Sequence, residues 1–169
     1  DATLLQLRML NESKGPAVHS LRAQVDKNKY HRTMKETLLN QKNLTVLEDE
    51  AKEIFQKDGK ICGVETCKGY KVECKSVVVA TGVYLNSRTI TGEIIKEEGP
   101  AGFENATHLT KSLINLGFVI KRFKTGTPPR LEKKSIDYSA FIEQPGEEGI
   151  QPFSYLTKVQ PPNVESCWL

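Results

Sequence analysis

The amino-acid sequence predicts a mixed α/β fold (an α+β mixture), and three patterns indicate it. Residues 16–40 carry apolar side chains at helical spacing, and residues 44–74 form short runs separated by glycine-containing turns. Residues 76–80 form a continuous, largely β-branched run, which is typical of a strand covered on both faces. We therefore expect one long helix, a set of short strands and one buried strand.

The first element is a helix that enters at Ser13-Lys14-Gly15-Pro16, because proline is favoured in the first turn of a helix. It continues to about Asn40, and residues 41–43 end it. Its expected buried stripe consists of Val18, Leu21, Val25, Met34 and Leu38.

An antiparallel meander follows. Its strands are expected at residues 44–47, 50–56, 61–67 and 70–74, although the polar side chains of the second run weaken that prediction. Asp58-Gly59 predicts a tight hairpin turn, since both residues readily adopt positive φ. The buried strand at residues 76–80 then ends at Thr81-Gly82.

The second half of the chain is less regular. Residues 86–105 are polar and predict a loop, residues 107–116 predict a helix closed by Gly117, and residues 118–123 predict a strand. Beyond Ser135 the chain is rich in proline and glycine, and residues 144–163 are expected to be extended.

Composition narrows the possible functions. A length of 169 residues fits one domain or pieces of two, and no apolar run reaches the roughly 20 residues of a membrane span. The beginning DATLLQLRML has neither an initiator Met nor a signal-peptide pattern, which suggests a chain that starts inside a longer protein. The four cysteines show no C-x-x-C spacing and the three histidines lie far from them in sequence, so we expect no metal site. Free thiols indicate the reducing cytoplasm.

Charge is unevenly distributed along the chain. Residues 8–42 carry eight basic and three acidic side chains, residues 119–134 carry six basic and one acidic, and residues 93–104 are acidic. Such basic segments fit a polyanionic partner, but solvated helix and strand faces also explain them, and charge alone favours that second interpretation.

Two short stretches have the residues that a binding site needs. Thr81-Gly82 ends a predicted central strand, where ligands lie in open α/β sheets, although many strands end in glycine only to turn. KTGTPPR, residues 124–130, combines hydroxyls and cations on a stiff backbone, which suits phosphate but also describes a rigid exposed loop. The chain has no G-x-G-x-x-G turn and no P-loop, and no catalytic residue set can be assembled.

Four stretches in this order resemble the GidA/MnmG family: RMLNESKGPAVHSLRAQVDK, VVVATGVYLNSRTITGE, GFVIKRFKTGTPPRLEKKSIDYS and QPFSYL. The resemblance covers nearly the whole chain. It implies an internal fragment of an FAD-binding domain similar to that of glutathione reductase, with a β-meander and the start of an inserted nucleotide-binding region. The implied boundaries are residues 1–130 for the partial FAD-binding domain and residues 131–169 for the start of the NADH-binding region.

The resemblance also implies a function. Family members are cytoplasmic enzymes that use FAD, NADH and methylenetetrahydrofolate, act with an MnmE-type GTPase and form homodimers. They add a carboxymethylaminomethyl or aminomethyl group to carbon 5 of the tRNA wobble uridine. This chain alone is expected to be inactive and to bind FAD weakly or not at all. A non-catalytic basic module that binds nucleic acid is the alternative, and a flavoenzyme acting on small molecules is a third.

The resemblance assigns cofactor-binding positions and no catalytic or metal-binding residue. Ala51 matches a backbone contact to the adenosine of FAD, Thr81 and Gly82 match a turn near the flavin nucleotide, and Ala106 stands where the family usually has Ser. The remaining positions lie in the two family motifs: Ser13, Lys14 and Gly15 near the flavin, and Lys124, Thr125, Gly126, Thr127 and Arg130 near the nicotinamide-binding region. Pro100 replaces a family Arg, which removes a cation. The role of Cys167 is left open.

Overall fold

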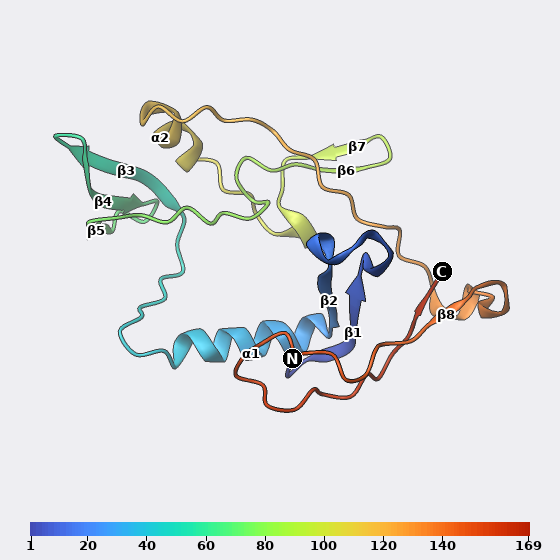
Figure 1. Cartoon of the computed structure of the whole chain (residues 1–169). Coiled ribbons are helices and arrows are strands. Elements are labelled where there is room, and N and C mark those ends of the chain that lie inside the picture. The colour runs from blue at the N-terminus through green and yellow to red at the C-terminus, as the bar shows by residue number, and fades with distance from the viewer. The chain divides into compact units, whose positions relative to one another are not determined.

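The computed structural model describes all residues 1–169 (Figure 1). The chain divides into two compact units. The hairpin unit comprises residues 1–46 and 127–169, and the meander unit comprises residues 47–126.

An antiparallel hairpin organises the hairpin unit. Strand β1 (Leu4–Leu10) pairs with β2 (Ser20–Val25), with Arg8 opposite Arg22, and two 3₁₀ turns, Glu12–Lys14 and Pro16–Val18, connect them. The predicted long helix is therefore wrong over its first half. Leu21, Ala23 and Val25 also alternate with a period of two, and β1 supplies the partner strand that decides between the two periods.

Helix α1 (Lys27–Leu39) confirms the second half of that prediction. The side chain of Asp26 accepts a hydrogen bond from the Lys29 amide (2.9 Å), which satisfies one of the free donors at the helix start. No residue of α1 is buried, and Met34 and Leu38 remain 38% and 46% exposed. The expected buried stripe is therefore wrong for this helix.

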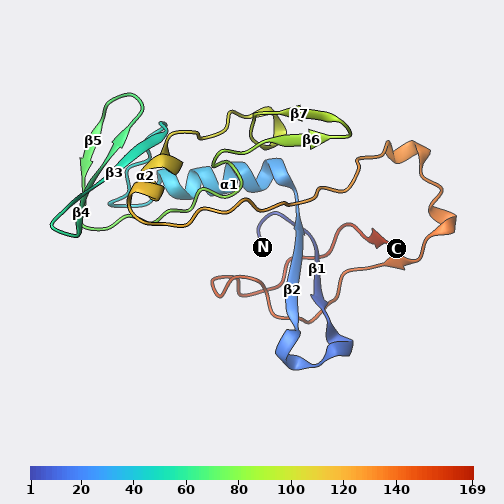
Figure 2. The ribbon, with the colours of Figure 1, turned by 90° about the horizontal axis from the view of Figure 1, so that it is seen from above.

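The C-terminal segment is fastened onto β1. Its regular parts are short: 3₁₀ turns Lys133–Ser135 and Tyr138–Ala140, and strand β8 (Glu143–Gln144) paired with β9 (Cys167–Trp168). Figure 2 shows this orange-to-red segment beside the blue hairpin. The amides of Glu147 and Val164 donate to the carbonyls of Leu7 (2.9 Å) and Leu5 (2.8 Å).

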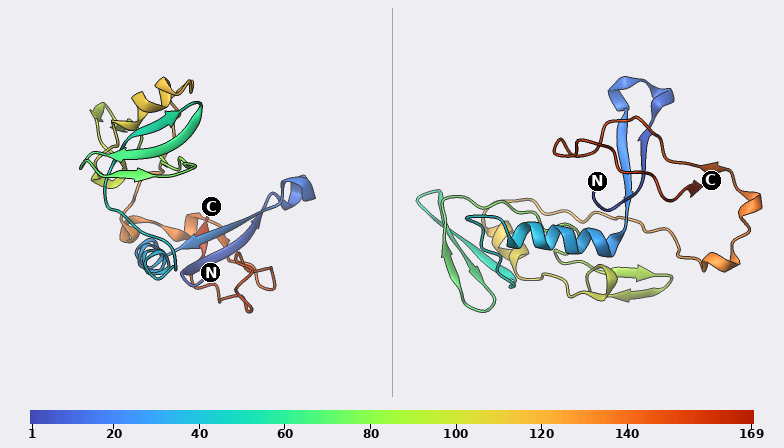
Figure 3. Two further views of the ribbon diagram at one scale, coloured as in Figure 1. Left: turned by 90° about the vertical axis from the view of Figure 1, so that its left-hand side faces the viewer. Right: turned by 90° about the horizontal axis from the view of Figure 1, so that it is seen from below.

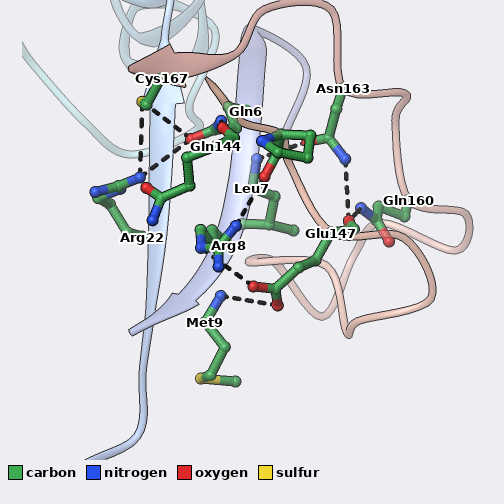
Figure 4. Close-up of polar contacts among 11 residues, drawn as sticks. Gln6, Leu7, Arg8, Met9, Arg22, Gln144, Glu147, Gln160, Asn163 and Cys167 are labelled. Atoms are coloured by element: carbon green, nitrogen blue, oxygen red, sulfur yellow. Dashed lines mark hydrogen bonds and ion pairs between the residues drawn. The ribbon is translucent and has the colours of Figure 1, made fainter. Parts of the chain in front are cut away.

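Side chains complete this attachment (Figure 4). The Leu7 amide donates to Asn163 Oδ1 (2.7 Å), and Gln6 Nε2 donates to the Gln144 carbonyl (2.7 Å). Leu7 is fully buried and Gln6 is 1% exposed. Burial of the Leu7 amide and of the Gln6 side-chain amide is tolerated because each has a hydrogen-bond partner.

The meander unit confirms most of the local predictions. Strands β3 (Ala51–Lys57), β4 (Lys60–Thr66) and β5 (Lys71–Glu73) form an antiparallel sheet in that order, with Asp58-Gly59 at the first turn. Helix α2 (Leu109–Asn115) packs against β3, as the left view in Figure 3 shows. A small core of Ile54, Leu109 and Leu113 joins the helix to the sheet.

The segment predicted as a loop contains further structure. Strands β6 (Thr89–Thr91) and β7 (Ile94–Lys96) form a short hairpin, and a 3₁₀ turn follows at Pro100–Gly102. Each of these strands has only three residues, which is too short for an alternating pattern to stand out in the sequence.

Three predicted strands are absent, at residues 44–47, 76–80 and 118–123. Several of their apolar side chains are strongly exposed, with Val78 at 89% and Phe123 at 91%, whereas Val77 packs against the small core. A strand forms only beside a partner that satisfies its backbone groups, and none is paired with these segments here. No helix has the length and apolar character needed to cross a membrane.

Candidate functional site

Four of the residues expected to contact the cofactor lie in the meander unit, and three of them are joined through one short piece of backbone. Thr81 and Gly82 form a turn in which the Tyr84 amide donates to the Thr81 carbonyl (3.2 Å). The next residue, Leu85, bridges Ala106 in parallel, and the Ala106 amide donates to the Tyr84 carbonyl (2.9 Å). The turn and Ala106 are therefore adjacent.

Gly82 has the conformation that the turn requires. Its φ is +56°, in the left-handed region that favours glycine. A side chain added there would meet only the Tyr84 ring, at 3.9 Å. The space beside this backbone is therefore open to a ligand.

Ala51, the fourth residue, is joined to this group through Glu50. The Glu50 carboxylate accepts hydrogen bonds from the Thr107 amide (2.7 Å) and the His108 amide (3.1 Å). The residue before Ala51 thus holds the residues that follow Ala106. Ala51 and Leu85 also pack against the same core.

A pocket of about 430 Å³ opens beside these segments. Glu50, Glu97, Glu98 and Glu104 contribute to its lining together with Gly102, Phe103, Asn105, Thr107 and His108. Four carboxylates and no lysine or arginine make the pocket electronegative. It suits a cation or a hydrogen-bond donor and disfavours a phosphate.

His108, which lines this pocket with Glu50, also lies close to a thiol. Its Nδ1 lies 3.0 Å from Glu50 Oε1 and 3.4 Å from Cys67 Sγ. Burial alone would raise the pKa of Glu50, but hydrogen bonds from the His108 backbone and side chain and from the Thr107 amide outweigh it and lower that pKa. Burial raises the pKa of the Cys67 thiol, and the Glu50 carboxylate raises it further.

No pattern in the sequence predicts this grouping. Cys67 and His108 are 41 positions apart, and no spacing rule connects them. The available signal was indirect: Cys67 precedes a predicted turn and His108 begins a predicted helix, so both lie at ends of elements that pack together.

The other expected site residues are exposed turns and coil. Ser13, Lys14 and Gly15 lie between β1 and β2, in the hairpin unit. Lys124, Thr125 and Gly126 end the meander unit, and Thr127 and Arg130 begin the second segment of the hairpin unit. Apart from Gly15, which is half-buried, all of these residues are exposed.

A second polar cluster, in the hairpin unit, shows which groups Cys167 contacts. Its Sγ donates to Gln6 Oε1 (3.2 Å) and accepts a long contact from the Arg22 guanidinium (3.7 Å), as Figure 4 shows. Arg22 also donates to Gln6 Oε1 (3.1 Å). These contacts hold β9 near the hairpin, so Cys167 has a structural role in this unit.

Comparison with known proteins gives consistent matches over the whole chain. The family described as "Glucose inhibited division protein A" matches residues 1–169. Two curated relatives are called "tRNA uridine 5-carboxymethylaminomethyl modification enzyme MnmG". They come from Lachnoclostridium phytofermentans (48% identical over 173 residues) and Clostridium kluyveri (48% over 170 residues). Both matches cover 100% of this chain and 27% of the relative, so the chain spans about a quarter of their length.

A solved structure agrees with these matches. The form I crystal structure of Aquifex aeolicus GidA matches 99% of this chain and 29% of its own, with 36% identity and a TM-score of 0.86. The mixed α/β architecture predicted from the sequence therefore corresponds to a segment of that structure.

Proposed function

The chain belongs to the glucose inhibited division protein A (GidA) family, and from this membership we propose that it forms part of the FAD-binding region of a tRNA-modifying enzyme. The reaction is the addition of a carboxymethylaminomethyl or aminomethyl group to carbon 5 of the wobble uridine, with NADH as reductant and methylenetetrahydrofolate as one-carbon donor. An MnmE-type GTPase and a second copy of the chain are the proposed partners, and the cytoplasm is the proposed location.

One observation carries the FAD proposal: Ala51, Thr81, Gly82 and Ala106 come from three separate stretches of sequence and are joined in the meander unit. The Ala106 amide is already bonded, so the group that it offers to FAD is its methyl. Small side chains and the open backbone at Gly82 suit the close approach of a flat ring. When bound, FAD supplies the hydride chemistry that connects NADH to the reaction on uridine.

The same residues do not suit the diphosphate of FAD. The pocket next to Ala106 is lined by Glu97, Glu98 and Glu104, and Pro100 offers no cation there. We propose that Ser13, Lys14 and Gly15 lie near the flavin, and that Lys124, Thr125, Gly126, Thr127 and Arg130 contact phosphate groups near the nicotinamide-binding region, which begins at residue 131. With few donors for the diphosphate in the chain, we expect it to bind FAD weakly or not at all on its own.

The surface of α1 supports contact with tRNA. Lys27, Lys29, Arg32 and Lys35 all lie on this helix, which buries none of its residues. Lysine and arginine side chains that neutralise phosphates give salt-dependent affinity for nucleic acid. The same observation supports the alternative of a non-catalytic nucleic-acid-binding module, so tRNA binding alone does not separate the two.

Flavin content distinguishes the tRNA-modifying enzyme from the non-catalytic nucleic-acid-binding module. The full-length family protein that contains this segment is expected to purify with FAD and to oxidise NADH. Ala106→Leu should lower FAD affinity by about tenfold or more, because the added atoms occupy the space of the ring. Ala140→Leu, at an exposed residue of the hairpin unit, is the matched control, and circular dichroism verifies that both variants fold. A full-length protein that lacks flavin and cannot reduce added FAD with NADH excludes the enzyme and leaves the module.

A further inference from the structure

Glu50, Cys67 and His108 bring three different metal-ligating atoms to one point of the meander unit. The ligand atoms of the three residues all lie within 4.8 Å of one another. We propose that these residues form a binding site for a divalent transition metal, with Zn²⁺ as the ion that fits best. The site does not depend on the proposed FAD or tRNA functions.

The distances are close to those of a metal centre. In a tetrahedral zinc site with bonds of about 2.0 Å to nitrogen and about 2.3 Å to sulfur, the two ligand atoms lie about 3.5 Å apart. Cys67 Sγ and His108 Nδ1 lie 3.4 Å apart. His108 Nδ1 and Glu50 Oε1, at 3.0 Å, need to separate by only a few tenths of an ångström for an ion to lie between them.

The backbone holds all three ligands in place. Glu50 precedes β3, and two amides at the start of α2 orient its carboxylate. Cys67 follows β4, and its amide donates to the Glu50 carbonyl (2.8 Å). His108 caps α2. Hydrogen bonds to a ligating carboxylate are what positions it for an ion, and they raise metal affinity.

The donor set selects the kind of ion. A thiolate and an imidazole favour Zn²⁺ over Mg²⁺ or Ca²⁺, which take oxygen ligands. Three protein ligands leave one position of a tetrahedron for water or a small ligand. Glu50 and His108 line the electronegative pocket, so that position is accessible from it, and the carboxylates of Glu97, Glu98 and Glu104 favour a cation there.

A nucleophilic Cys-His-acid arrangement is the competing interpretation, and the geometry argues against it. In a catalytic relay the thiol and the acid contact opposite nitrogens of the imidazole. Here Cys67 and Glu50 both contact Nδ1. A relay would place the imidazole between the thiol and the acid. Here the three ligand atoms surround one position, which is the arrangement that a metal ion requires.

Co²⁺ titration of the reduced full chain tests the site, because thiolate–Co²⁺ bonds give a near-ultraviolet charge-transfer band and tetrahedral Co²⁺ absorbs strongly in the visible. We expect one Co²⁺ per chain with both features, and displacement by Zn²⁺. Cys67→Ser and His108→Asn should weaken Co²⁺ binding by more than about tenfold, and Cys67→Ser should abolish the charge-transfer band.

Cys62→Ser is the matched control, since Cys62 is an exposed thiol on β4 and belongs to no such cluster. It should bind Co²⁺ like the unaltered chain. Circular dichroism verifies the fold of each variant. A chain that gives no thiolate band, a band that survives Cys67→Ser, or a band that Cys62→Ser removes would each overturn the proposal.

Discussion

The two units of this chain are stabilised in opposite ways. In the hairpin unit, β1 is held by groups 137 to 161 positions later in the sequence, and hydrogen bonds to backbone and side-chain amide groups contribute much of the attachment. In the meander unit, strands that pair are also neighbours in the sequence. Ile54 of β3 packs against Leu109 and Leu113 of α2 to form a small core.

This difference predicts how the stability of each unit responds to substitutions. The hairpin unit has to close a very long loop, and buried polar groups such as the Leu7 amide and the Gln6 side chain depend on distant partners. The meander unit closes short loops, and its polar cluster of Glu50, Cys67 and His108 is partly exposed to water. We therefore expect the distant contacts to fail as a group and the meander to lose local order in smaller steps.

The largest expected effect comes from Leu7→Ala. Leu7 is fully buried, so truncation leaves a cavity and should destabilise the hairpin unit by about 2–5 kcal/mol. Hydrogen exchange should show lost protection in β1, β2 and the C-terminal segment, with the meander unchanged. Leu131→Ala, at a side chain that is 69% exposed in the same unit, is the control. Equal loss of protection in both units would show that they do not unfold separately.

A matched pair of variants compares the polar attachments directly. Asn163→Ala removes the acceptor of the Leu7 amide, and Ser112→Ala removes the acceptor of the Ile54 amide (2.9 Å). Each leaves a buried N–H without a partner, which costs about 1–3 kcal/mol. We expect Asn163→Ala to release residues 143–169 from β1 and Ser112→Ala to affect only α2 and β3. Protease cleavage sites, mapped by mass spectrometry, distinguish the two outcomes.

A loss of equal extent in both variants would contradict the comparison. Asn115→Ala, at an exposed residue that ends α2, should leave both cleavage patterns unchanged.

A smaller loss of stability is expected for helix α1, because it is buried neither by a core nor by a distant segment. Asp26→Ala removes the side-chain acceptor at its start and should cost about 0.5–2 kcal/mol of helix stability. Far-UV circular dichroism should show fraying. Asp26→Asn retains an acceptor and should restore most of the signal. Unchanged helicity in Asp26→Ala would mean that α1 is held by contacts other than its cap.

The same contrast explains which parts of the structure the sequence could predict. Asp58-Gly59 and Gly117 determine turns through their own backbone preferences, so the hairpin between β3 and β4 and the end of α2 were predicted correctly. Residues 18–25 fit two periods, and only pairing with β1 selects the strand. Residues 76–80 have the composition of a buried strand but no partner, so their pattern could not decide the outcome.

The candidate site also contains residues that the sequence suggested and residues that only the structure reveals. The family resemblance suggested Ala51, Thr81, Gly82 and Ala106, and hydrogen bonds through Glu50 and Tyr84 explain how three stretches meet. Glu50, Cys67 and His108 follow no motif, because the fold of the meander and the packing of α2 bring them together. Tertiary contacts of this kind leave no periodic trace in a single sequence.

The smallest expected effect is a pH dependence confined to the meander unit. Hydrogen bonds from His108 and Thr107 hold the pKa of Glu50 below its ordinary value of 4.5, despite the opposing effect of burial. Because the folded-state pKa is the lower one, the stabilisation is fully present above the ordinary value and is lost as the pH falls through the lowered value. The NMR shifts of the Thr107 and His108 amides should therefore titrate together in acid. Glu50→Gln keeps an oxygen acceptor without a titrating carboxyl and should flatten both curves, whereas Glu147→Gln, in the hairpin unit, should leave them unchanged. Curves that persist in Glu50→Gln would assign the transition to another carboxyl.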